Sequence, residues 1–155
     1  MNSKKNFDSL LLNTPILFLV FNRPDTTSIV FEKIRQTKPP RLYVAGDGPR
    51  KGNDEDKEKV KKVRDIVNRI DWPCEVKTLF QEGNLGCKKG VSTAITWFFK
   101  QEEKGIILED DCVPNLDFFN FCESLLDRYA KDERISVISG NNFQNGKWRG
   151  DASYY

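Results

Sequence analysis

The sequence predicts an α/β fold, in which a Rossmann-like and mostly parallel sheet is flanked by helices. Two observations predict it. Short apolar runs alternate with longer amphipathic segments along the 155 residues, and neither an internal repeat nor a linker interrupts this order. Strands that alternate with helices are typical of parallel sheets, because each crossover helix covers a face of the sheet. We expect residues 15–155 to form one domain behind an N-terminal extension, residues 1–14.

The beginning of the domain predicts one strand and one helix. Residues 15–21 are almost continuously apolar, which is typical of a strand that is covered on both faces. A helix over residues 25–36 follows, with Asp25 or Thr26 as its cap, and a Lys-Pro-Pro sequence stops it. The side chains expected on its inner face are Ile29, Val30 and Ile34.

The middle of the chain predicts two more strands and two more helices. Residues 41–45 are predicted to form a strand that ends in a Gly-Asp-Gly turn. Residues 53–70 carry valine and isoleucine at spacings of three and four, which places a single apolar stripe on a charged helix. Residues 74–80 predict the third strand, and a glycine-punctuated loop leads from it into a helix over residues 88–101.

The last part of the chain continues the same alternation. The segment Gly-Ile-Ile-Leu-Glu at residues 105–109 predicts a fourth strand, and residues 117–129 predict a helix. Residues 134–139 predict a fifth strand. Strand and helix therefore alternate from the first strand to the fifth.

The composition excludes several classes of site. The chain contains no histidine, so histidine-based triads, zinc hydrolases and histidine proton shuttles are excluded. Its four cysteines form no CxxC pair, and we expect reduced and mostly buried thiols instead of a zinc site, an iron–sulfur cluster or a disulfide scaffold. Any acid–base or metal chemistry must therefore use carboxylates.

Charge and hydropathy limit the expected partners. The net charge of +2 gives no reason to expect a nucleic-acid partner. The longest apolar run, residues 15–21, is far shorter than the roughly 20 residues that a membrane-spanning helix needs. We therefore expect no transmembrane segment and a cytoplasmic location, with peripheral association at the inner membrane face as the alternative.

Polar side chains follow the predicted strands at the edge of the sheet where such folds bind ligands. Arg23 lies beyond the first strand, Asp47 beyond the second, and the triplet Glu109-Asp110-Asp111 at the end of the fourth. Three adjacent carboxylates repel one another, and a hard divalent cation with oxygen ligands relieves this repulsion. In an extended segment Glu109 and Asp111 point to one side and Asp110 to the other, so one side is suited to a metal and the other to a hydroxyl-rich ligand such as ribose.

Each of these residues also has a purely structural interpretation. The triplet can be explained as solvated turn residues, Asp47 as part of an ordinary Gly-Asp-Gly turn, and Arg23 as half of a surface salt bridge. Neither GxGxxG nor GxxxxGK[ST] is present, so the fingerprints of dinucleotide-binding folds and of P-loop enzymes are both missing.

Four segments carry a family resemblance: PILFLVFNRPDTT, RLYVAGDG, GIILEDDCVPNLDFFNFCESLL and RISVISGNN, in this order between Pro15 and Asn142. Together they resemble glycosyltransferases of the GT-A fold, especially the N-acetylglucosaminyltransferase I-like group and related bacterial nucleotide-diphospho-sugar transferases. The third segment is the most specific, because it resembles that group's EDD version of the DxD motif, its proline and its Asp-Phe-Phe helix start.

The resemblance implies metal-dependent transfer of a sugar from a nucleotide-diphosphate sugar, with a UDP-sugar expected, to a hydroxyl of a glycan or lipid-linked acceptor. It implies that Asp111 is the direct ligand of Mn²⁺ or Mg²⁺, and that Glu109 supports the water shell of the metal or the sugar. By the same resemblance Asp110 contacts the ribose or sugar of the donor, Asp47 recognises the base, and Arg23 contacts the uridine or the diphosphate.

The family resemblance also implies inversion at the anomeric carbon and a carboxylate base well downstream of the acidic motif. Because the chain continues for only 44 residues after Asp111, we expect the base and the C-terminal acceptor-binding part to be absent, so that the chain is a donor-binding fragment. Two alternatives remain open. One is a nucleotidyltransferase, against which the NRPDTT loop counts because it is neither glycine-rich nor basic; the other is a non-catalytic α/β binding module.

Overall fold

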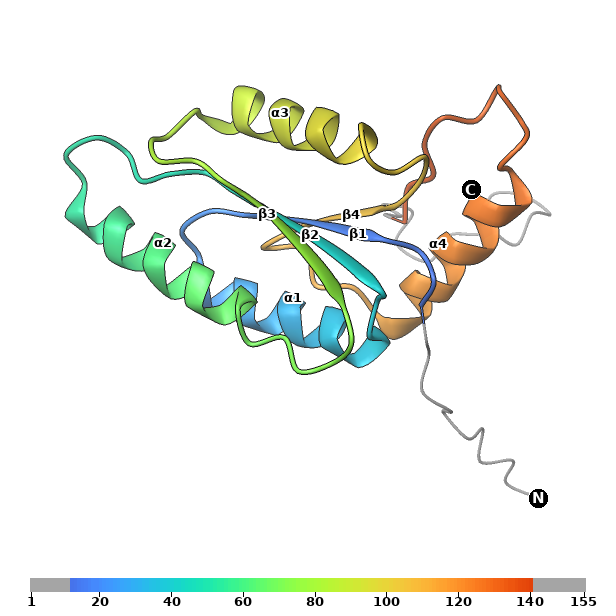
Figure 1. The fold of residues 1–155 in the computed structure, drawn as a ribbon, viewed down its shortest axis with the longest axis horizontal. Coiled ribbons are helices and arrows are strands. Elements are labelled where there is room, and N and C mark those ends of the chain that lie inside the picture. Colours follow the sequence, from blue (N-terminus) through green and yellow to red (C-terminus); the bar gives the residue numbers. More distant parts are fainter. Residues whose placement is uncertain (1–11, 141–155) are drawn as a thin grey trace, which may run out of the picture.

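Four parallel strands form the centre of the fold, and helices cover both faces of the sheet (Figure 1). The computed structural model describes residues 12–140. Its elements are β1 (Ile16–Val20), α1 (Pro24–Thr37), β2 (Arg41–Gly46), α2 (Asp54–Val67), β3 (Glu75–Phe80), α3 (Cys87–Phe99), β4 (Ile106–Glu109) and α4 (Leu116–Arg128). The strand order across the sheet is β3-β2-β1-β4, and a helix makes each crossover. The predicted α/β class, with a helix-flanked parallel sheet, is confirmed.

Alternate side chains of the central strands supply two separate cores. Ile16 and Phe18 of β1 belong to a core with apolar residues of α1, α2 and α4. Leu17 and Leu19 belong to a second core on the opposite face, together with Phe98 of α3. Because helices cover both faces, all five residues of β1 are buried, which explains the nearly continuous apolar run in the sequence.

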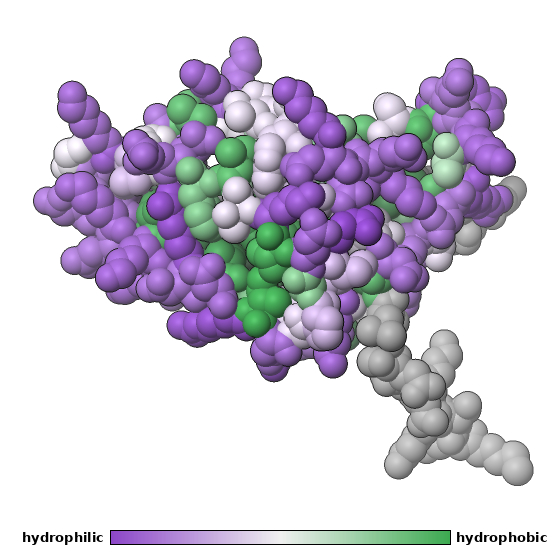
Figure 2. Space-filling view, viewed as in Figure 1, coloured by the Kyte–Doolittle hydropathy of each residue, from purple (hydrophilic) through white to green (hydrophobic). Residues whose placement is uncertain are grey.

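The strands β3 and β4 form the two edges of the sheet. In the space-filling view of Figure 2, hydrophilic residues surround an apolar area near β3, in keeping with the 40% exposure of Val76. Lys77 and Glu75 form an ion pair of 3.2 Å on this edge strand, and such charges oppose pairing with another chain. Along residues 12–140, no helix combines the length and the apolar composition that crossing a bilayer requires.

The chain before β1 packs against two helices. The N–H of Leu12, which is buried, donates to the carbonyl of Thr37 at 3.1 Å. Glu123 of α4 accepts the N–H of Thr14 at 3.0 Å. Residues 12–14, which the sequence assigned to an N-terminal extension, thus pack against the domain, and the remainder of that extension lies outside the described residues.

The predicted fifth strand is wrong. Residues 134–139 form no strand, and Val137 is 81% exposed. An ion pair of 2.7 Å between Asp132 and Arg134 precedes this irregular segment. Alternating hydrophobicity produces a strand only where the edge of a neighbouring strand pairs with the segment. Among the described residues β4 pairs with β1 alone, so residues 134–139 do not extend the sheet. Residues 141 and 142, which end the RISVISGNN segment, lie outside the described residues.

The start of α1 also differs from its prediction. Neither Asp25 nor Thr26 caps the helix, because Arg23 is its N-cap residue and no side chain supplies a capping hydrogen bond. Pro24 occupies the first turn, where a missing N–H has no cost. Ile29, predicted to lie inside, is 51% exposed, since α1 buries its neighbouring apolar positions instead.

We expect Gly105→Ala to lower the free energy of unfolding by about 1–3 kcal/mol, the usual cost of overpacking. A Cβ at Gly105 would lie 2.3 Å from the fully buried ring of Phe98 and 2.9 Å from the carbonyl oxygen of Pro15. Gly83→Ala is the matched control, because a Cβ there meets no atom within 4 Å. Urea denaturation of both variants checks this, and equal stabilities would contradict the tight contact.

Candidate functional site

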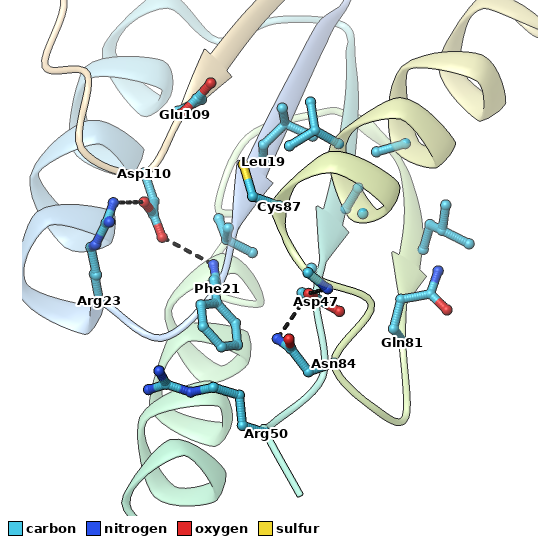
Figure 3. A pocket seen from close by; sticks show the side chains of 18 residues that line it. Leu19, Phe21, Arg23, Asp47, Arg50, Gln81, Asn84, Cys87, Glu109 and Asp110 are labelled. Atoms are coloured by element: carbon cyan, nitrogen blue, oxygen red, sulfur yellow. Dashed lines mark hydrogen bonds and ion pairs between the residues drawn. The ribbon is translucent and has the colours of Figure 1, made fainter.

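A pocket of about 340 Å³ lies at the carboxyl ends of the strands, beside the first turns of α3 (Figure 3). This is the edge at which parallel α/β sheets bind ligands. Its lining combines apolar side chains with polar ones. The apolar residues include Leu19, Ala45, Leu79, Val91 and Ala94, and the polar ones include Arg23, Asp47, Arg50, Gln81, Asn84, Glu109 and Asp110.

The structure brings the predicted site residues together around this pocket. Arg23, Asp47, Glu109 and Asp110 line it. Asp111 is not among the lining residues, but its carboxylate lies 2.5 Å from the guanidinium of Arg23. The strand-end argument therefore correctly predicted that these residues lie close together.

Asp110 holds the segment that follows β1. Its side chain is 7% exposed; Oδ2 accepts the N–H of Phe21 at 3.0 Å, and Oδ1 accepts a hydrogen bond from Arg23 Nη1 at 3.2 Å. Burial raises the pKa of the Asp110 carboxyl above its ordinary value, and the N–H of Phe21 and the charge of Arg23 offset part of that rise. Both oxygens of Asp110 are thus engaged within the chain.

The three carboxylates of the triplet do not converge on one point. Glu109 is exposed and is directed away from Asp110, as Figure 3 shows. The side chain of Asp111 is 43% exposed, and its Oδ2 accepts a hydrogen bond of 2.5 Å from Arg23 Nη1. The alternation expected of an extended segment is not observed, because residues 110–111 form a turn and the side chains of Asp110 and Asp111 contact the same guanidinium nitrogen of Arg23.

The donor atoms nevertheless fit a hard divalent cation. Within residues 12–140, no group of three or more histidine, cysteine, aspartate or glutamate side chains is arranged to hold a metal ion. Mg²⁺ and Mn²⁺ need fewer protein ligands when a substrate phosphate completes the shell, and one or two carboxylates suffice. Arg23 Nη1 contacts both Asp110 Oδ1 and Asp111 Oδ2, so a positive charge already stands between these two oxygens.

Asp47 binds a loop of its own chain. Its Oδ1 accepts the N–H groups of Gly48 at 2.9 Å and Leu85 at 2.8 Å. Its Oδ2 accepts the N–H of Gly86 at 3.1 Å and the side-chain amide of Asn84 at 2.9 Å. Four donors use the acceptor capacity of this carboxylate. In this structure Asp47 therefore positions the loop before α3, and a base N–H would have to replace one of these donors.

The sequence analysis missed a second arginine and the carboxylate that orients it. Arg50 lines the pocket, and its Nε and Nη2 donate to Asp56 at 2.5 and 2.9 Å. Asp56 is buried in the first turn of α2 and also accepts the side-chain amide of Asn22 at 2.7 Å. The spacing of Asn53 and Asp56, which suits a helix cap, was the one signal of this arrangement.

The first turn of α3 borders the pocket through Gly86, Cys87 and Gly90. Its N-terminal amides favour negative charge nearby. A Cβ at Gly90 would lie 3.6 Å from Asp47 Oδ2, so the helix approaches the strand end closely. Cys87 and Cys112 are exposed and Cys74 is half-buried, so the expectation of mostly buried thiols is wrong for all but Cys122; the four thiols are free.

We expect Asp47→Ala to release the loop before α3. The N–H groups of Leu85 and Gly86 would lose their acceptor, which costs about 1–3 kcal/mol and corresponds to roughly ten- to hundredfold faster amide exchange. Hydrogen exchange at these two amides measures the effect. Asn84→Ala is the control, because it removes one side-chain donor and leaves both backbone bonds intact. Unchanged exchange in Asp47→Ala would contradict a positioning role.

We expect the stability of Asp56→Asn to differ from wild type most strongly near neutral pH. The hydrogen bonds from Arg50 hold the pKa of Asp56 well below its usual range. A carboxylate with a lowered folded-state pKa stabilises the protein above its unfolded pKa of about 3.9, and this contribution is lost as the pH falls below that value.

Denaturation of the wild type and Asp56→Asn from pH 7 to pH 2 checks this expectation. The difference between the two free energies of unfolding should shrink progressively as the pH falls below about 4. Asp54→Asn, which changes a carboxylate in the same turn whose side chain is 89% exposed, should show a much smaller difference near neutral pH. Parallel profiles for wild type and Asp56→Asn would show that the charge of Asp56 is not what stabilises the segment.

Comparisons of the chain with models of protein families, with curated proteins and with solved structures found no match.

Proposed function

We propose that this chain is a metal-dependent glycosyltransferase, or the donor-binding part of one, and that it binds a nucleotide-diphosphate sugar as the donor. One observation carries the proposal. An apolar pocket, a helix N-terminus, the guanidinium of Arg23 and the acidic triplet all meet at the carboxyl edge of one parallel sheet. Each part suits a different portion of such a donor.

The nucleoside suits the apolar part of the pocket between the sheet and α3. Leu19, Ala45 and Ala94 are buried there and present no hydrogen-bonding side-chain groups to a flat ring. Asn84 and Gln81 supply amide groups nearby. A small number of polar groups around an apolar pocket is the usual arrangement for a nucleotide or cofactor. A UDP-sugar remains the expected donor on the family resemblance.

The diphosphate suits the polar part of the same pocket. The amides of the first turn of α3 and the guanidinium of Arg23 both favour phosphate oxygens. Asp111, exposed and next to Arg23, would hold the divalent cation together with those phosphates. When bound, the cation supplies positive charge that stabilises the departing diphosphate.

The reaction that follows from such a site is a displacement at the anomeric carbon. An acceptor hydroxyl oxygen bonds to that carbon, the bond from the carbon to the diphosphate oxygen breaks, and a carboxylate base takes the hydroxyl proton. A glycan or a lipid-linked precursor is the acceptor class that the resemblance implies. The residues assigned here serve donor binding and the leaving group.

The alternative is a non-catalytic module that binds an anion without metal. One observation favours it: Arg23 already forms ion pairs with Asp110 and Asp111, so these two carboxylates have a positive partner without a metal ion. The two proposals differ in whether binding of a nucleotide depends on a divalent metal.

We expect UDP to bind in the presence of Mn²⁺, and Asp111→Ala to weaken this binding by at least about a hundredfold, because a direct ligand contributes more than the outer partners of a metal site. Isothermal calorimetry with and without Mn²⁺ measures it. Asp127→Ala removes an exposed carboxylate of α4 and should bind as the wild type does. UDP binding of equal affinity with and without Mn²⁺ would favour the non-catalytic module. No UDP binding at all would contradict the proposal.

A further inference from the structure

One guanidinium nitrogen links two carboxylates of the acidic triplet. Arg23 Nη1 lies 3.2 Å from Asp110 Oδ1 and 2.5 Å from Asp111 Oδ2. The two oxygens belong to adjacent residues in the turn after β4, so a single positive charge is shared between them. A divalent cation that bound both Asp110 Oδ1 and Asp111 Oδ2 would need the two oxygens that Arg23 Nη1 now contacts.

The side chain of Arg23 can leave while its backbone stays in place. Arg23 is the N-cap residue of α1, and its carbonyl accepts the N–H and the hydroxyl of Thr27 at 3.0 and 2.7 Å. The side chain is 56% exposed. Asp110 keeps the N–H of Phe21 at 3.0 Å after the guanidinium departs, so the segment after β1 retains that connection.

We propose that Arg23 is an exchangeable counter-ion: it occupies the cation position at Asp110 and Asp111, and a divalent cation that binds there displaces its guanidinium towards the phosphates of the nucleotide. The inference rests on the proposed function, both for the cation and for the nucleotide. The competition between Arg23 and a cation at Asp110 Oδ1 and Asp111 Oδ2 can be measured without nucleotide.

The exchange couples two binding equilibria. In the protein without ligand, the cation must break the contacts of Arg23, which weakens its binding. A diphosphate accepts the released guanidinium with planar hydrogen bonds, so nucleotide strengthens cation binding. By linkage the cation strengthens nucleotide binding by the same factor, and couplings of this kind are typically about five- to 150-fold.

The test measures Mn²⁺ binding first without nucleotide, by the electron paramagnetic resonance signal of free Mn²⁺. Arg23→Gln should bind Mn²⁺ about two- to fivefold more tightly than wild type, the range expected from losing its partly exposed ion pair with Asp111. Arg35→Gln is the matched control. It removes the same charge near the other end of α1, from an arginine paired with Asp71, and should bind Mn²⁺ as the wild type does. Asp111→Ala should abolish binding.

The same titrations with saturating UDP measure the coupling. UDP should tighten Mn²⁺ binding at least about fivefold in wild type, and this gain should be much smaller in Arg23→Gln. Circular dichroism of each variant establishes that it is folded.

The outcomes separate this inference from the proposed function. Tighter Mn²⁺ binding in Arg23→Gln but not in Arg35→Gln supports the competition, even if UDP binds to neither protein, a result that would reject the nucleotide-sugar proposal. Equal Mn²⁺ affinity in wild type and Arg23→Gln overturns the exchange, even if UDP binds normally. Equal tightening in both arginine variants, or no Mn²⁺ binding in any protein, also overturns it.

Discussion

The three residues that follow β1 are held by two buried carboxylates, and the arrangement of the pocket depends on this constraint. Asp110, after β4, accepts the N–H of Phe21 and a hydrogen bond from Arg23. Asp56, in the first turn of α2, accepts the side-chain amide of Asn22, the residue between them. A surface segment that would otherwise be free to move is thereby joined to a strand end and to a helix start. Networks of this kind restrict a segment to one arrangement when their members are satisfied.

The same two carboxylates also orient the positive charges near the pocket. Arg23 bonds to Asp110 and Arg50 to Asp56, so each arginine has a buried partner and a partly exposed side chain. A buried carboxylate is costly without a partner, and a guanidinium supplies both charge and planar hydrogen bonds. The same two ion pairs thus serve both stability and ligand recognition. A ligand that draws one arginine towards itself takes that partner away from a buried carboxylate.

Sequence reasoning succeeded where local pattern was sufficient. The alternation of apolar and amphipathic segments predicts the parallel sheet, and the strand-end rule brings Arg23, Asp47 and the triplet to one edge. Sequence reasoning failed where the structure of a segment depends on residues far away in the chain. The alternating residues 134–139 resemble a strand but have no paired edge. Three of the four donors to Asp47 come from a loop 37 to 39 residues away in sequence. The ion pair of Arg50 with Asp56 likewise depends on side-chain geometry that no spacing rule specifies.

The position of Asp110 has a consequence for the order of folding. Its hydrogen bond to Phe21 joins residues 89 apart in the chain, and the pairing of β1 with β4 spans a similar distance. Contacts between remote segments form slowly, because the chain between them must first lose much of its freedom. The pairing of β1 with β2 is far more local. The half of the pocket next to β2 can therefore form early in synthesis, whereas the half that carries the acidic triplet is completed only after β4 has emerged and found its place.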